Sequence, residues 1–161
     1  MLRIDRRAPP PIVIGQRQGG FRVAVHRTEI RVRYADTDRA GVVYHANYLV
    51  FFEVGRTEMM RELGCPYSAL EARGFVMPVI ESRLAFRAPA RYDDRLTVES
   101  ELLEVERVRF KIGTRVIHAE TDKVLAEGWL RLACTGPDGR PTPIPEDARR
   151  LMLDDIFRKD A

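Results

Sequence analysis

The chain has 161 residues and a mass of 18.5 kDa, the size of one ordinary domain. Its composition, 45% hydrophobic and 32% charged, supplies enough apolar surface for a core and excludes a wholly disordered protein. The net charge of +3 originates in the first 33 residues, which hold eight arginines and two acidic residues. That segment has one aromatic residue and no repeated basic run, so we expect no nucleic-acid partner.

The uncharged runs are too short to cross a membrane. The longest span residues 8–16 and 40–52, whereas a membrane-spanning helix needs roughly 20 residues. The start of the chain lacks the apolar region of a signal peptide, so we expect a cytoplasmic protein with no membrane span. Cys65 and Cys134 are the only cysteines, too few for a disulfide framework or a zinc cluster.

Residues 1–22 are predicted to form a disordered or extended tail, because three consecutive prolines and several glycines interrupt any periodic pattern. A first strand is expected over 23–35, where apolar and charged residues alternate. This pattern places Ile30, Val32 and Tyr34 on one face of the strand.

The clearest predicted element is a long amphipathic helix over 47–63. Asn47 is the expected N-cap and Gly64 the expected C-terminal stop. A second, short helix is predicted over 67–73. The apolar residues of the long helix recur every three or four positions, at Tyr48, Phe51, Phe52, Gly55, Met59 and Leu63.

The second half of the chain reads as strands followed by a helix. Turn residues at 92–94 and 120–122 favour hairpins and therefore an antiparallel sheet. The resulting fold class is α+β, with a long helix against one curved antiparallel sheet of about five strands. The main domain covers 23–135, and 136–161 form a C-terminal turn and helix. The predicted strands span 75–87, 95–105, 107–118 and 124–135, and the terminal helix spans 145–157.

The loop before the long helix holds the residues that could carry chemistry: Asp36, Asp38, His45 and Asn47. Backbone N–H groups at a helix N-terminus can polarise a carbonyl or bind an anion. A carboxylate beside them can act as a general base or nucleophile on an acyl group. Aspartates before a helix are more commonly caps, and position alone does not decide between the two roles.

Other chemistries lack a motif in this sequence. A calcium loop also begins D-x-D, but only Asp36, Asp38 and Gly41 fit it, because Ala40 and Asn47 occupy two of its ligand positions. Glycine-rich nucleotide loops, the GxSxG elbow and the HExxH zinc motif are all missing. The spacing of the three histidines suggests no metal site, so we expect no metal or redox cofactor.

A longer motif carries a family resemblance. The run Asp-Thr-Asp-Arg-Ala-Gly-Val-Val-Tyr-His-Ala-Asn-Tyr over 36–48, followed by Glu53 and Arg56-Thr57-Glu58, resembles the hotdog-fold thioesterases. It is closest to the 4-hydroxybenzoyl-CoA thioesterase family, and within it to the acyl-CoA thioesterases associated with the Tol-Pal operon. Met-Pro-Val-Ile at 77–80 and Arg-Tyr-Asp-Asp-Arg-Leu at 91–96 also fit, so the resemblance covers about 30–134.

The resemblance implies a hotdog fold, an acyl-CoA substrate and no cofactor beyond it. It also implies a homodimer or homotetramer with active sites at the subunit interface. It places the catalytic carboxylate on Asp38, acting as nucleophile or general base. The N–H groups that polarise the thioester carbonyl map to about Tyr44 and His45, and the His45 side chain would orient water or substrate.

Three further residues have weaker assignments. Asn47 could help to position the substrate besides capping the helix. Arg107 and Arg109 occupy the region whose basic residues contact coenzyme A phosphates in related enzymes, although a solvated strand face explains them equally well.

Two other functions stay open beside thioester hydrolysis. One is a hotdog hydratase or dehydratase, against which the DTDRAGVVYHANY run argues. The other is a non-catalytic acyl-carrier or envelope-complex binding protein, against which Asp38 argues. The acyl group itself is not predicted, because Tyr48, Phe51, Phe52 and Met59 have the spacing of core residues.

Overall fold

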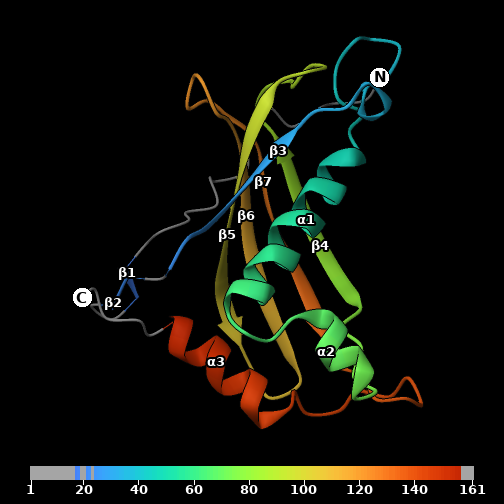
Figure 1. Ribbon diagram of the computed structural model, residues 1–161, viewed down its shortest axis with the longest axis vertical. Coiled ribbons are helices and arrows are strands. Elements are labelled where there is room, and N and C mark those ends of the chain that lie inside the picture. The colour runs from blue at the N-terminus through green and yellow to red at the C-terminus, as the bar shows by residue number, and fades with distance from the viewer. Residues whose placement is uncertain (1–16, 19–20, 23, 157–161) are drawn as a thin grey trace, which may run out of the picture.

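A computed structural model of the chain describes residues 17–18, 21–22 and 24–156. Its body is one curved five-stranded sheet wrapped around a long helix (Figure 1). The strands are β3 His26–Arg31, β4 Val79–Phe86, β5 Arg95–Val105, β6 Arg109–His118 and β7 Val124–Ala133. They lie in the order β3-β5-β6-β7-β4, and each is antiparallel to its neighbours. The strands β3 and β4 are therefore the two edges of the sheet.

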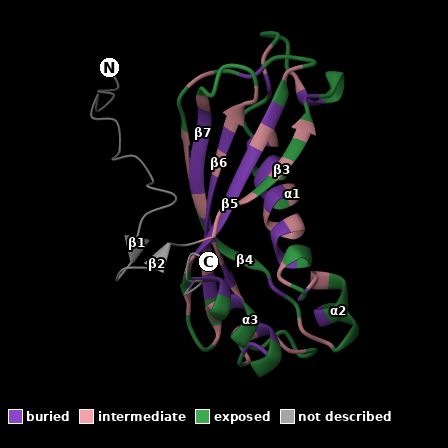
Figure 2. Ribbon diagram, turned by 60° about the vertical axis from the view of Figure 1, so that its left-hand side comes forward, coloured by how far each residue is buried: buried purple, intermediate pink, exposed green. Residues whose placement is uncertain are grey.

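The long helix α1, Asn47–Glu62, covers one face of this sheet and carries the core. Its apolar stripe is buried as predicted except at Leu63, which follows the helix and is half-buried; Figure 2 shows the buried colour on the side of α1 that faces the strands. Gly55 sets the closeness of the packing, because a Cβ there would lie 2.5 Å from Val98 Cγ1 and 2.7 Å from Ser100 Oγ. The helix thus approaches β5 by leaving out one side chain.

The remaining helices lie at the end of the sheet away from the start of α1 (Figure 1). They are α2 Tyr67–Ala72 and α3 Glu146–Ile156. A two-residue ladder pairs β1 Arg17–Gln18 with β2 Phe21–Arg22 inside the predicted tail. The rest of that tail, 1–16 and 19–20, lies outside the described residues. None of the helices in the described ranges is both long and apolar enough to span a bilayer.

The first strand ends earlier than the alternation of residues predicts. Tyr34 does not continue the inward face but begins a short 3₁₀ turn, η1 Tyr34–Asp36, and is 79% exposed. The cause is Asp36, whose Oδ2 accepts the backbone N–H of Arg33 at 2.8 Å and so turns the chain out of the sheet.

One of the two predicted hairpins is wrong. The turn at 120–122 joins β6 to β7 as expected, with Asp122 at φ +54°. The turn at 92–94 instead links β4 to β5, which are not neighbours because β6 and β7 lie between them. A local turn pattern cannot distinguish a hairpin from a crossing between distant strands.

Candidate active site

The functional loop is built around a tight turn at Asp38. The N–H of Gly41 donates to the Asp38 carbonyl at 2.9 Å, and the N–H of Asp38 donates to the Val42 carbonyl at 2.9 Å. Gly41 has φ +74°, a conformation that favours glycine at this point of the turn. The turn therefore holds Asp38 at a defined place immediately before α1.

Only one of the two oxygens of the Asp38 carboxylate accepts a hydrogen bond within the described chain. Its Oδ1 accepts the N–H of Ala40 at 2.8 Å. Its Oδ2 has no hydrogen-bond partner among the described residues, and the side chain is exposed. One oxygen thus fixes the orientation of the group while the other stays free to accept a proton or attack an electrophile.

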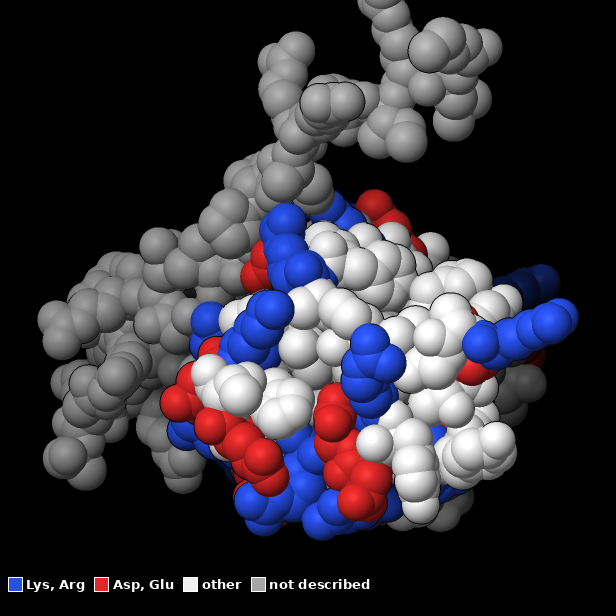
Figure 3. Space-filling model, turned by 90° about the horizontal axis from the view of Figure 1, so that it is seen from above, with Lys and Arg blue, Asp and Glu red and all other residues white. Residues whose placement is uncertain are grey.

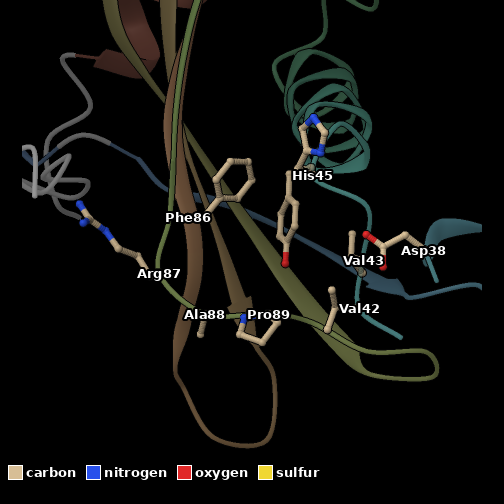
Figure 4. Close-up of a pocket in the computed structure, with 9 residues that line it drawn as sticks. Asp38, Val42, Val43, His45, Phe86, Arg87, Ala88 and Pro89 are labelled. Carbon is tan, nitrogen blue, oxygen red and sulfur yellow. The ribbon is translucent and has the colours of Figure 1, made fainter. Parts of the chain in front are cut away.

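Asp38 lines a cavity of about 360 Å³ between the turn, the start of α1 and the end of β4. Figure 4 shows Asp38 with Val42 and Val43 on one side and Phe86 and Arg87 on the other. The wall is mostly apolar, which suits an acyl group. The complete lining is Asp38, Val42, Val43, His45, Tyr48, Phe86, Arg87, Ala88 and Pro89.

The wall formed by residues 86–89 is absent from the sequence prediction. It is held against the loop through Ala90, whose N–H donates to Tyr48 Oη at 3.1 Å and whose carbonyl accepts Val43 N–H at 2.9 Å. Burial raises the pKa of the Tyr48 phenol, which keeps it protonated. Pro89, which interrupts the strand pattern, was the only local signal for this wall.

Arg87 brings a cation to the cavity wall. Its Nη2 lies 2.6 Å from Glu127 Oε1, and its side chain is 26% exposed. Because Glu127 is buried on the neighbouring strand, the pair balances charge at the edge of the cavity.

Asp36 has the structural role that its position suggests. Its Oδ1 accepts Arg33 Nη2 at 2.7 Å, and its Oδ2 accepts the Arg33 backbone N–H. The Arg33 guanidinium lowers the pKa of the Asp36 carboxyl, so this group stays ionised. With both oxygens engaged, Asp36 caps the turn.

Tyr44 and Asn47 both donate hydrogen bonds within the loop. This corrects the predictions that the Tyr44 amide polarises the thioester carbonyl and that Asn47 is the N-cap. The N–H of Tyr44 donates to the Asp36 carbonyl at 2.9 Å, so this amide is not free to polarise a substrate. Asn47 is not the N-cap: Ala46 holds that position, and Asn47 Nδ2 donates to the same Asp36 carbonyl at 2.8 Å. The two hydrogen bonds close the loop, since Tyr44 lies eight residues and Asn47 eleven residues after Asp36.

His45 is differently placed. Its N–H has no acceptor within the described part of the chain, and it lies in the turn that leads into α1. The His45 ring faces the cavity, with its centroid 6.5 Å from that of Phe86 and perpendicular to it. The His45 amide is therefore one of the free donors at the positive end of the helix dipole, together with the amides of Ala46 and Tyr48 among the described residues.

Arg107 and Arg109 do not line this cavity. Phe86, at the cavity wall, pairs with Ala126, which pairs with Val116 of β6. Arg109 lies seven residues from Val116 along β6, a separation of about 23 Å. Its guanidinium is also engaged, with Nε 2.7 Å from Glu106 Oε2.

No group of three or more histidine, cysteine, aspartate or glutamate side chains in the described ranges is arranged to hold a metal ion. The chemistry that the site offers is a carboxylate oxygen facing a cavity beside a free amide at a helix N-terminus. This arrangement can activate water, or attack a carbonyl directly, while the amide stabilises the oxyanion.

Comparison with known proteins identifies relatives of this chain. The acyl-CoA thioester hydrolase YbgC of Escherichia coli O157:H7 is 35% identical over 121 residues, covering 74% of this chain and 90% of that protein. YneP of Bacillus subtilis is 45% identical over 76 residues, which are 47% of this chain and 55% of that protein. The chain thus spans about half the length of this second relative.

Solved structures share the fold. The hypothetical protein TT1821 of Thermus thermophilus superposes with a TM-score of 0.76 at 39% identity, covering 80% of this chain and 97% of that one. The 1,4-dihydroxy-2-naphthoyl-CoA thioesterase Slr0204 of Synechocystis has the same TM-score at 26% identity, covering 81% and 97%. These matches confirm the hotdog fold.

The family model of the thioesterase-like superfamily matches residues 32–152, which include the Asp38 turn, α1 and every strand of the five-stranded sheet except β3. The chain therefore belongs to the thioesterase-like superfamily.

Proposed function

We propose that this protein is an acyl-CoA thioesterase, which hydrolyses a thioester to a free carboxylic acid and coenzyme A. The observation that carries the proposal is the free Oδ2 of Asp38 at a mostly apolar cavity beside the start of α1. The relative named acyl-CoA thioester hydrolase supports the same substrate class. Water is the only other reactant, so the reaction needs no cofactor beyond its substrate.

Asp38 can act by either of two routes. As a general base it takes a proton from water, whose oxygen attacks the thioester carbonyl. The tetrahedral intermediate then expels the thiolate, which takes the proton back from Asp38 as the acid forms. As a nucleophile, Asp38 attacks the carbonyl, expels the thiolate and forms a mixed anhydride that water opens.

The oxyanion that forms in either route needs a donor. We assign this role to the His45 N–H, because the Tyr44 N–H is already donated to Asp36. The first turn of α1 adds the partial positive charge of the helix N-terminus. The His45 side chain, on the cavity wall, is placed to orient water or substrate.

A second copy of the chain would complete the cavity. The strand β4 is an unpaired edge of the sheet, and it exposes Val79, Ile80 and Phe86. An apolar edge strand favours pairing with another strand. We therefore propose a homodimer, or a tetramer of two such dimers, in which the β4 edges pair beside the two cavities. Light scattering on the purified protein tests this, and a monomer would contradict it.

The function is tested by thiol release from a panel of short, long and aromatic acyl-CoAs. We expect wild-type protein to hydrolyse some of them and Asp38→Asn to lose most turnover at unchanged stability, because the amide is a poor base and nucleophile. Asp154→Asn is the matched control, since this exposed aspartate lies on α3 at the other end of the fold. Full activity in Asp38→Asn would refute the assignment.

The two routes are separated by a single turnover in ¹⁸O-labelled water. Attack by Asp38 gives a mixed anhydride, and water that opens it at the Asp38 carbonyl leaves label in the aspartate, so label found in Asp38 identifies the nucleophilic route. General-base catalysis places the label only in the product acid.

A further inference from the structure

Two arginines beside the Asp38 turn are left without an ionic partner. Arg39 follows Asp38 in the turn and is exposed. Arg91 reaches the turn from the β4–β5 connection, with Nη1 3.4 Å from the Gly41 carbonyl oxygen. Within the described ranges neither guanidinium has a carboxylate at ion-pair distance. These two cations lie beside the turn that carries Asp38 into the cavity wall.

Several other charged groups at this end are already paired. Arg31 pairs with Asp93 at 2.9 Å, and Arg33 pairs with Asp36 at 2.7 Å. The Asp94 carboxylate accepts the Arg91 backbone N–H at 2.7 Å and lies 3.8 Å from His118 Nε2. The guanidiniums of Arg39 and Arg91 are therefore exposed cations beside the Asp38 turn that can pair with an anion from solvent.

The same end exposes an aromatic pair. Tyr34 and Tyr92 are 79% and 58% exposed, and their rings lie 5.7 Å apart at 85°. Figure 3 looks onto this end, where a broad uncharged surface is bordered by both basic and acidic side chains. Exposed aromatic rings outside the core favour a flat ligand, because stacking on a base contributes about 1–3 kcal/mol.

We propose that Arg39 and Arg91 bind the phosphates of the coenzyme A nucleotide, and that Tyr34 and Tyr92 hold its adenine. This inference rests on the proposed thioesterase function. Pro89 lines the cavity and Tyr92 follows three residues later, so the two are at most about 11 Å apart along the backbone. The flexible pantetheine arm joins the thioester and the nucleotide over such a distance.

In this proposal Arg39 and Arg91 contact the coenzyme A phosphates in place of Arg107 and Arg109. It also predicts a preference for coenzyme A thioesters over thioesters of a carrier protein. An acyl group carried on phosphopantetheine alone, as on a carrier protein, lacks the adenosine and its 3′-phosphate. It would lose the stacking and part of the charge pairing at this site. The enzyme is therefore selective for coenzyme A thioesters.

The test is calorimetric titration with coenzyme A and with pantetheine. We expect Arg39→Gln and Arg91→Gln each to raise the Kd for coenzyme A about threefold, and the double variant about tenfold. Pantetheine binding should stay unchanged, and added salt should weaken only coenzyme A. Arg150→Gln, an exposed arginine on α3, is the matched control. Unchanged coenzyme A binding in the double variant would overturn the proposal, as would a loss caused by Arg107→Gln instead.

Turnover of an acyl-pantetheine separates this inference from the proposed function. Retained turnover in the double variant shows that replacing Arg91 has not disturbed the Asp38 turn. If wild-type protein hydrolyses neither thioester but binds coenzyme A through Arg39 and Arg91, thioester hydrolysis fails and the nucleotide site stands. If it hydrolyses both with equal KM, the nucleotide site fails and hydrolysis stands.

Discussion

His26 joins three elements of the fold, and its removal gives the sharpest stability prediction. Its Nδ1 lies 2.6 Å from Glu62 Oε2 on α1, and its Nε2 lies 3.2 Å from both carboxylate oxygens of Asp155 on α3. The His26 side chain is 9% exposed and that of Asp155 only 2%. The imidazolium therefore ties the C-terminal helix to β3 and to the end of α1.

His26→Ala should lower the free energy of unfolding by about 3 kcal/mol. The reason is Asp155, whose carboxylate would stay buried without its partner, and removal of one member of a buried pair costs about 3–5 kcal/mol. We place the effect at the lower end because water can reach the exposed Glu62 side of the cluster. Glu62→Gln should cost less than about 1 kcal/mol for the same reason.

The cluster also makes stability depend on pH. Hydrogen bonding to Asp155 raises the pKa of His26 above 6.5, against the effect of burial. The folded protein thus binds this proton more tightly than the unfolded chain. The stabilisation is fully present below about pH 6.5 and is lost as the pH rises through the folded-state pKa.

The measurement is denaturant unfolding of wild type and His26→Ala at several pH values. The difference between them should be largest at low pH, where the imidazolium is charged, and should shrink above neutrality. Asp155→Asn in the His26→Ala background should restore part of the loss, because a buried amide costs less than a buried carboxylate. Parallel pH profiles, or a loss of less than 1 kcal/mol for His26→Ala, would refute the reasoning.

Two further substitutions test the packing behind the site. Gly55→Ala should lower the unfolding free energy by about 1–3 kcal/mol, because its Cβ would lie 2.5 Å from Val98; an unchanged denaturation midpoint would contradict this close approach. Tyr48→Phe should cost about 1–3 kcal/mol and lower kcat, because the buried Ala90 N–H loses its acceptor and the wall formed by residues 86–89 loosens. Unfolding and acyl-CoA kinetics measure both effects, and full activity at wild-type stability would show that this wall does not depend on Tyr48.

The sequence predicts secondary structure correctly where a single periodic pattern of apolar residues determines it. The three-and-four spacing in α1 predicted the buried stripe, because every such residue faces the same side of a helix whatever covers it. The terminal helix and most strands were predicted within a few residues for the same reason. Asp36 was also predictable as a cap, because its partner Arg33 lies three residues away.

What the sequence could not predict depends on contacts between distant segments. The Asp36 carbonyl accepts donors from Tyr44 and Asn47, and these bonds decide which amide remains available at the helix N-terminus. The cavity wall at residues 86–89 lies beside Asp38 only because β4 is the edge next to β7 and not next to β5. Apart from Pro89, which interrupts the strand pattern, neither arrangement leaves a local signal in the chain.

The two aspartates of the loop differ in their hydrogen bonds, and the proposed function gives them different roles, Asp36 in stability and Asp38 in chemistry. Both oxygens of Asp36 bind Arg33, and its carbonyl holds the start of α1, so its carboxylate cannot take part in the reaction. Asp38 uses one oxygen to fix its own orientation through Ala40 and keeps the other free. Asp36→Asn should therefore lower stability and activity together, whereas Asp38→Asn should lower activity alone. Comparing unfolding and turnover in the two variants measures this division directly, and equal stability losses would show that Asp38 also holds the loop.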